Sequence, residues 1–247
     1  MKSNFERQKH SKSNWQIEEK PQPYLYGSVF SSSDDLKRQK IADTISEQYL
    51  RTSVKEKASQ GNYAVAISLL DELIALCPHN AADYNNRGLM YFRNNQIVEA
   101  LCDLSQALKI NPCLDSAYNN RANCHAAQGD LAEAIADYDL ALDLNPANLR
   151  AWINQGITFR ELELYDLALE NFDIALIVGD ALEERIYAER GRTYHLRGDW
   201  NCAVGDYHKA LDVLATKPSL AKYNQKVTAW LNKLLSPIND ANGQYPI

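Results

Sequence analysis

The stretch "YNNRGLMYF", residues 84–92, returns as "YNNRANCHA" at 118–126 and as "WINQGITFR" at 152–160. Each copy begins thirty-four residues after the one before it. A fixed period of this length is the signature of a structure made from repeated units. With Tyr84 placed fourth, the units are 47–80, 81–114, 115–148 and 149–182, and a fifth, 184–217, follows one inserted residue, Glu183. The period therefore decides the fold.

The places of the repeat keep side chains of one size. The eighth place is small in the last four units and the twentieth is alanine in all five: Gly88, Ala122, Gly156 and Gly191, then Ala66, Ala100, Ala134, Ala168 and Ala203. A small residue opposite alanine lets two helices approach closely, and aromatic residues at the fourth and twenty-fourth places fill the space beside that contact. Apolar places recur at helical spacing twice per unit, which predicts two amphipathic helices in each.

These places resemble the tetratricopeptide repeat family over residues 47–217. The wording of "YNNRG" and "AIADYDLALDLNP" is similar to bacterial members, including proteins that assist the assembly of photosynthetic complexes. The resemblance implies an all-α fold, a right-handed superhelical solenoid of about five helix–turn–helix repeats with a concave groove. One helix pair cannot bury its apolar face alone, so stacked units share one core and need a cap at the end.

The segments beside the repeats differ from them in composition. Residues 1–31 are rich in Ser, Lys, Gln and Asn and predict a disordered tail, although its "PQPYLYGSVF" could dock on a partner or fold back onto the groove. A leading helix is expected over 32–46. Apolar residues at helical spacing predict a capping helix over 218–235, and a partner-binding or membrane-surface helix is the alternative there. Residues 236–247 are expected to form a C-terminal tail.

Composition and charge exclude several classes of protein. The 247 residues carry a formal net charge of −6, so a general attraction to nucleic acid is not expected. Five cysteines without a CxxC pair favour a reducing compartment over a disulfide framework. The charged start is followed by no apolar h-region, and nowhere do about eighteen apolar residues run together, so we expect neither a signal peptide nor an integral membrane segment. The simplest prediction is a cytoplasmic protein.

The sequence lacks motifs for catalysis or for a cofactor. It contains no HExxH, GxSxG, GxxxxGK[ST] or GxGxxG. Cys124 and His125, with Cys113, come nearest to a metal cluster, and cysteines that pack in the core are the expected alternative. We therefore expect no enzyme, no cofactor and no metal, and a chain that works by binding.

The resemblance also implies where binding occurs, because first helices line the groove in this family. Carried onto this sequence, the family's groove places are Asn86, Leu89, Phe92, Arg93, Asn119, Asn120, Asn123, Arg150, Ile153, Asn154, Ile157 and Arg160. An asparagine amide both donates and accepts hydrogen bonds. The row of asparagines therefore suits the backbone of an extended peptide, and bonding within the scaffold is an equal alternative.

Charge separates these places from the rest of the repeats. Residues 47–217 hold 25 acidic and 15 basic side chains, whereas the groove places hold cations with acids only at their margin. Arg93, Arg150 and Arg160 would supply that charge, and the apolar members would receive anchors from a ligand. The expected ligand is therefore a protein or peptide with carboxylates.

The sequence thus predicts a non-catalytic scaffold, an adaptor or complex-assembly factor that holds an extended acidic segment. The alternative is a regulatory module whose groove is occupied by its own N-terminal aromatic tail. The family also includes a carboxylate clamp for the tails of chaperones, and here Ser116 and Asn120 replace two of its cations while Glu189 would oppose a carboxylate. Chaperone-tail binding is therefore not predicted. Arg87 and Arg121 are expected to pair with acids at the groove edge.

Overall fold

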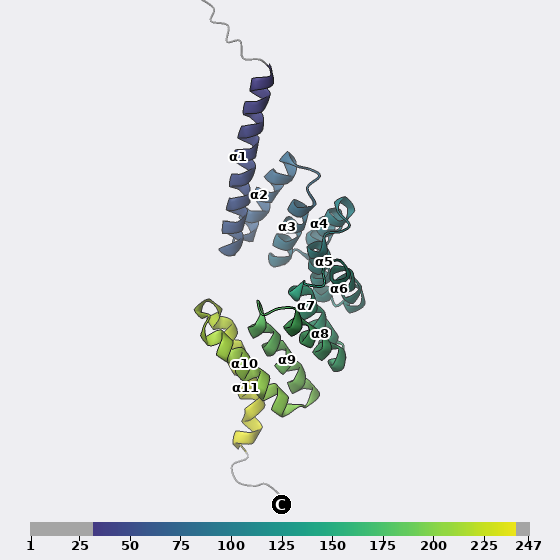
Figure 1. The fold of residues 1–247 in the computed structure, drawn as a ribbon, viewed down its shortest axis with the longest axis vertical. Helices are drawn as coiled ribbons and strands as arrows, with labels where there is room; N and C mark the ends of the chain where they lie inside the picture. The colour runs from purple at the N-terminus through teal and green to yellow at the C-terminus, as the bar shows by residue number, and fades with distance from the viewer. Residues whose placement is uncertain (1–31, 241–247) are drawn as a thin grey trace, which may run out of the picture. The chain divides into compact units, whose positions relative to one another are not determined.

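The structure, a computed structural model, describes residues 32–240, and every regular element in that range is helical (Figure 1). The predicted N-terminal tail, 1–31, and residues 241–247 lie outside the described residues. The elements are α1 (Ser32–Ser59), α2 (Tyr63–Leu76), α3 (Ala81–Arg93), α4 (Ile97–Ile110), α5 (Asp115–Gln128), α6 (Leu131–Leu144), α7 (Leu149–Glu161), α8 (Tyr165–Val178), α9 (Glu183–Arg197), α10 (Trp200–Ala215), the 3₁₀ turn η1 (Pro218–Leu220) and α11 (Ala221–Asp240).

The chain divides into a small unit, 1–43, which holds the first part of α1, and a large unit, 44–247. All contacts described below belong to the large unit. In it, the helix pairs α3 and α4, α5 and α6, α7 and α8, and α9 and α10 follow the thirty-four-residue frame.

Consecutive helices pack against one another, and first helices of adjacent units also touch: α3 with α5, α5 with α7 and α7 with α9. These first helices therefore form one continuous layer, which is the layer that lines the groove in a stack of helix pairs. The prediction of an all-α repeat solenoid is confirmed.

The repeated small residues lie where the two helices of a unit touch. The alanines of the twentieth place are fully buried. A Cβ atom added to Gly88 would lie 2.8 Å from Leu104 Cγ, and one added to Gly156 would lie 3.0 Å from the Phe172 ring. Both distances are shorter than ordinary contacts, so a larger side chain would push the helices of the unit apart.

The turn inside each unit places its fifteenth residue in the left-handed conformation. Glycine supplies this conformation in three units, with φ of 74° at Gly61, 88° at Gly129 and 96° at Gly198. The same place holds Asn95 and Glu163 in the other two, both with φ of 61°. Asparagine tolerates this region, whereas glutamate is rare there. Glu163 is therefore the strained member of the series.

The two ends differ from their predicted boundaries. The predicted leading helix, 32–46, continues without a break into the first helix of the first unit, so both belong to α1. At the other end α11 continues to Asp240, past the predicted limit at residue 235. Its Val227, Leu231 and Leu234 are 0%, 6% and 1% exposed against α10 and its neighbours. α11 thus covers the apolar face of the last repeat.

Candidate binding groove

A hollow of ≈ 620 Å³ lies over the first helices in the middle of the stack. Nine of the predicted groove residues line it: Asn86, Leu89, Phe92, Arg93, Asn119, Asn120, Asn123, Arg150 and Asn154. Four further residues complete the lining: Asn85, Ser116, Asn148 and Arg185. Seven of the thirteen are asparagines, three are arginines and none is acidic.

Amide side chains from α3, α5 and α7 are bonded to one another in a single chain. Arg185 Nη2 donates to Asn154 Oδ1 at 2.8 Å, and Asn154 Nδ2 donates to Asn119 Oδ1 at 3.3 Å. Asn119 Nδ2 donates to Asn120 Oδ1 at 3.3 Å, and Asn120 Nδ2 donates to Asn85 Oδ1 at 2.9 Å. Each amide oxygen of this chain already accepts one bond, and each amide nitrogen has an N–H left. The asparagines therefore bond within the scaffold, and the half-buried Asn120 and Asn154 each keep an N–H for a ligand.

Cationic side chains surround the amide chain. Arg93 and Arg150 are exposed, and neither forms an ion pair within the part of the chain that the structure describes. Arg185 bonds Asn154 and has no carboxylate partner among those residues. The hollow thus carries positive charge that the scaffold does not neutralise.

Three predicted groove residues do not line the hollow, and the burial of Ile153 and Arg160 corrects the prediction for those two. Ile153 is fully buried in a core cluster that also contains Ile186 of α9. Ile157 packs against the core cluster that contains Ile153. Arg160 is buried, and its Nη1 lies 2.8 Å from Glu189 Oε2. Its charge is therefore neutralised inside the scaffold.

Arg87 and Arg121 pair with acids, as predicted, but the acids lie on second helices. Arg87 donates through Nε and Nη2 to Asp103 at 2.7 and 2.8 Å. Arg121 contacts both carboxylate oxygens of Asp137 at 2.7 Å. These hydrogen bonds raise the pKa of each guanidinium. Neither arginine lines the hollow, so both tie the two helices of a unit together rather than edge the groove.

Comparison with known families agrees with this architecture. A family model described as tetratricopeptide repeat matches residues 53–112, and a second with the same description matches 116–148. The chain contains tetratricopeptide repeats. No curated protein sequence matches it.

Solved structures share the fold of this tetratricopeptide repeat protein. A thermophilic tetratricopeptide repeat protein from Thermus thermophilus is 18% identical, with a TM-score of 0.66 over 74% of this chain and 99% of that one. MamA is 20% identical, with a TM-score of 0.55 over 67% and 96%. A tetratricopeptide repeat protein from Parabacteroides merdae is 20% identical, with a TM-score of 0.57 over 81% of each chain. At these identities the likeness shows the fold alone.

Tetratricopeptide repeats mediate protein–protein interactions and are typically non-catalytic, so this protein is an interaction scaffold in the general sense.

Among the described residues, no group of three His, Cys, Asp or Glu side chains is placed to hold a metal ion. Cys124 is buried, which raises the pKa of its thiol to about 12, and Cys113 is exposed. None of the described helices combines the length and apolar content needed to cross a bilayer.

The repeat contains the signal for three of the four lining residues that the prediction omits. Ser116 and Arg185 occupy the second place of their units, as Arg150 does, and Asn85 occupies the fifth place, as Asn119 does. Asn148 is different, because it is the N-cap of α7 and belongs to the turn between units. A set drawn from helix places alone therefore leaves it out.

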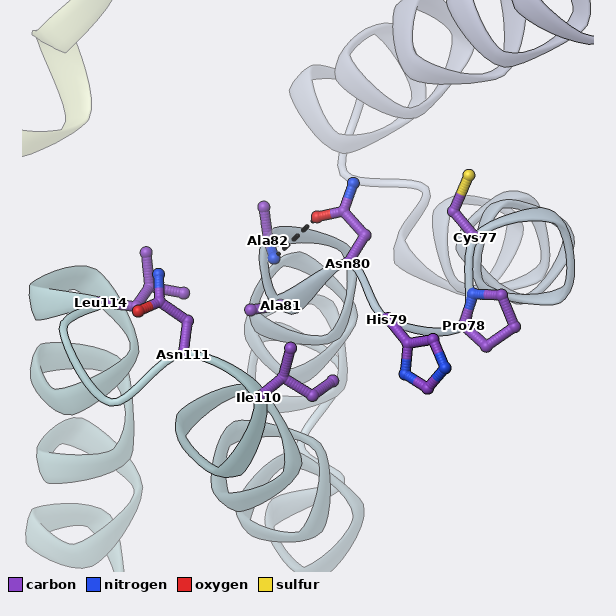
Figure 2. A pocket seen from close by; sticks show the side chains of 9 residues that line it. All are labelled: Cys77, Pro78, His79, Asn80, Ala81, Ala82, Ile110, Asn111 and Leu114. Atoms are coloured by element: carbon purple, nitrogen blue, oxygen red, sulfur yellow. Dashed lines mark hydrogen bonds between the residues drawn. The ribbon is translucent and has the colours of Figure 1, made fainter.

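A second hollow, of ≈ 680 Å³, lies at the turns between units (Figure 2). Figure 2 shows Pro78, His79 and Asn80 on one turn, with Ile110 and Leu114 beside them. The side chain of Asn80 is occupied in capping α3, where it accepts from the Ala82 backbone N–H at 3.0 Å. The lining of this second hollow holds no carboxylate, lysine or arginine. This hollow offers little to fix a charged ligand, so we assign the candidate site to the groove.

Proposed function

We propose that this tetratricopeptide repeat protein is a non-catalytic adaptor or complex-assembly factor that holds an extended, acidic segment of a partner protein in its groove. The observation that carries the proposal is the charge of the lining. Three arginines and no acid line the hollow, although acidic residues outnumber basic ones by 25 to 15 across residues 47–217. Such a local excess of cations favours a ligand with carboxylates.

The geometry suggests how the segment is held. The amide chain offers N–H donors, which suit the carbonyl oxygens of an extended backbone. Arg93 and Arg150 are exposed beside it and can meet carboxylate side chains. Leu89 and Phe92 are half-buried members of the same lining and can receive one apolar anchor.

Fluorescence anisotropy of a labelled peptide that alternates glutamate with leucine tests the proposal. We expect the full chain to bind it roughly tenfold more tightly than a peptide with glutamine in place of glutamate, because exposed ion pairs each contribute up to about 1 kcal/mol. Raising the salt concentration should narrow this difference, since surface charges are screened. Equal affinity for the two peptides at low salt would contradict the proposal.

The alternative, in which the N-terminal tail occupies the groove, is less well supported by charge. Residues 1–31 carry five basic and three acidic side chains, which a cationic groove does not favour. We expect a chain without these residues to bind the glutamate peptide with unchanged affinity. An increase of several-fold on their removal would instead support autoinhibition.

The proposal keeps three narrower expectations from the sequence, namely a cytoplasmic location, no nucleic-acid ligand and no chaperone-tail clamp. The structure weakens one reason for the last, since Glu189 is paired with Arg160 and does not face a ligand as a bare carboxylate. Ser116 and Asn120 still stand where the clamp has cations. A free peptide ending in clustered acids should therefore compete no better than the internal glutamate peptide.

A further inference from the structure

The capping helix α11 carries cations beside Trp230, which is half-buried against the core cluster of the last repeat. Lys226 Nζ lies 4.9 Å from the centre of the Trp230 ring, and Arg192 Cζ lies 4.7 Å from the same point. The two cationic centres are therefore less than about 10 Å apart. Neither residue forms an ion pair within the described part of the chain. Like charges held this close repel, and a bound anion would relieve that repulsion.

Lys233 extends this positive surface. It is exposed, has no ion-pair partner among the described residues, and follows Lys226 by two helix turns, so the two share one side of α11. His195 of α9 lies near Arg192 of α9 and Lys233 of α11. Burial lowers the pKa of His195, and the positive charges of Lys233 and Arg192 lower it further. The imidazole is therefore uncharged at neutral pH and neither adds to nor offsets the cations.

The nearest acid on this face of α9 is already occupied. Glu189 is 6% exposed and pairs with Arg160 at 2.8 Å. Its other oxygen accepts from the Tyr223 hydroxyl at 3.4 Å. Glu189 therefore does not neutralise the cations beside Trp230.

The positive surface continues from the hollow. Arg185 lines the hollow, and Arg192 follows it by seven residues on α9, which places both on one face about 10 Å apart. An extended chain advances about 3.3 Å per residue. A peptide that leaves the hollow at Arg185 thus reaches Arg192 after about three residues.

We infer that α9 and α11 form a second anion-binding subsite, made of Arg192, Lys226, Lys233 and Trp230, for carboxylate side chains of an extended acidic peptide. The inference rests on the proposed function, because the same peptide occupies the hollow first. It gives α11 two roles on two sides. Val227 and its apolar neighbours seal the last repeat, and the cationic side binds the continuation of the ligand.

Two labelled peptides separate this subsite from the groove. The short peptide alternates glutamate with leucine and is long enough for the hollow. The long peptide adds two further glutamate–leucine repeats at whichever end gives the tighter binding. The variant is K226Q/K233Q, and the matched control is K109Q/K209Q. The control removes the same charge from exposed lysines on the second helices α4 and α10. Thermal melting of both variants checks that they stay folded.

We expect the full chain to bind the long peptide at least threefold more tightly than the short one. K226Q/K233Q should lose roughly three- to tenfold in affinity for the long peptide and keep its affinity for the short one, as expected for two exposed ion pairs. K109Q/K209Q should bind both peptides like the parent. Equal binding of the long and short peptides by the parent chain would overturn the subsite and leave the groove standing.

Other outcomes are equally decisive. If neither peptide binds, the proposed function fails and the subsite fails with it. If the control loses the long peptide as much as K226Q/K233Q does, net charge explains the effect and the subsite is overturned. If K226Q/K233Q reduces only the sedimentation of the chain with anionic phospholipid vesicles, α11 is a membrane-surface helix instead.

Discussion

At the scale of residues, a side chain at the seventh place joins two second helices in the second, fourth and fifth units. Arg87 contacts Asp103 of its own unit and Asp71 of the unit before it. In the fourth unit a neutral pair takes this role. Asn171 Nδ2 donates to Gln155 Oε1 at 2.8 Å, and Gln155 Nε2 donates to Asp139 at 2.6 Å. The same contact between second helices is thus made by arginine with aspartate in one unit and by glutamine with asparagine in another.

The two versions should be exchangeable only as a pair. N171D alone places a buried carboxylate opposite an amide, and we expect it to lower the free energy of unfolding by about 1–3 kcal/mol. Adding Q155R should recover most of that loss, because the guanidinium then pairs with both carboxylates as Arg190 does with Asp206 and Asp173. Urea denaturation of the single and double variants measures both effects. Additive losses would show that the fourth unit does not follow the frame.

The strained turn residue gives a second prediction at this scale. Glu163 is exposed and adopts φ of 61°, and its side chain has no hydrogen-bond or ion-pair partner among the described residues. E163G should therefore raise the free energy of unfolding by about 0.5–1 kcal/mol, since glycine adopts this region without a steric penalty. The melting temperature should rise by roughly 1–4 °C. N95G is the matched control at the same place and should gain less, and a destabilised E163G would disprove the argument.

Residue-level burial was only partly predictable from the sequence. The small places and the central asparagines follow from the period, because every unit repeats the same neighbours. The burial of Arg160 does not, because it depends on a partner in the unit that follows. Glu189, which lies on α9 two residues before Gly191, pairs with Arg160. A period shows which places are equivalent and cannot show which partner the next unit supplies.

At the scale of elements, α11 stabilises the last repeat by covering its apolar face. Val227 is fully buried in the cluster that also contains Tyr207 and Leu214, whereas Ala229 on the same helix is exposed. Helix positions, turns and the cap were predictable, since apolar periodicity and turn residues are local signals. The unbroken α1 was not, because no proline or glycine separates residues 46 and 47. The length of α11 was not, because the helix continues through Pro237, a residue that normally ends a helix.

A buried charge on α11 tests the capping role. V227D should detach the helix and lower the free energy of unfolding by about 3 kcal/mol or more, because a carboxylate would be buried without a partner. A229D places the same charge on the exposed side and should change stability by less than about 0.5 kcal/mol. Thermal melts with light scattering record stability and self-association together. Equal melting of the two variants would show that α11 does not seal the stack.

At the scale of the whole molecule, charge is sorted between the two helix layers of the repeat unit. The arginines of the seventh place are neutralised by acids of the second helices, at Arg87, Arg121 and Arg190. The arginines that line the hollow have no such partners in the described part of the chain. The acidic repeats therefore line their groove with cations, and that lining is where an acidic partner gains most.

The most direct test of this account is a charge exchange across the groove. R93E/R150E reverses the charge of two exposed side chains of the lining, and K109E/K209E reverses the charge of two exposed lysines on second helices. In anisotropy titrations, R93E/R150E should lower the affinity for the glutamate–leucine peptide by roughly tenfold or more and raise the affinity for a lysine–leucine peptide. K109E/K209E should keep the preference of the parent chain for the glutamate–leucine peptide. If both variants shift alike, or if R93E/R150E still prefers the glutamate peptide, the groove is not the binding site.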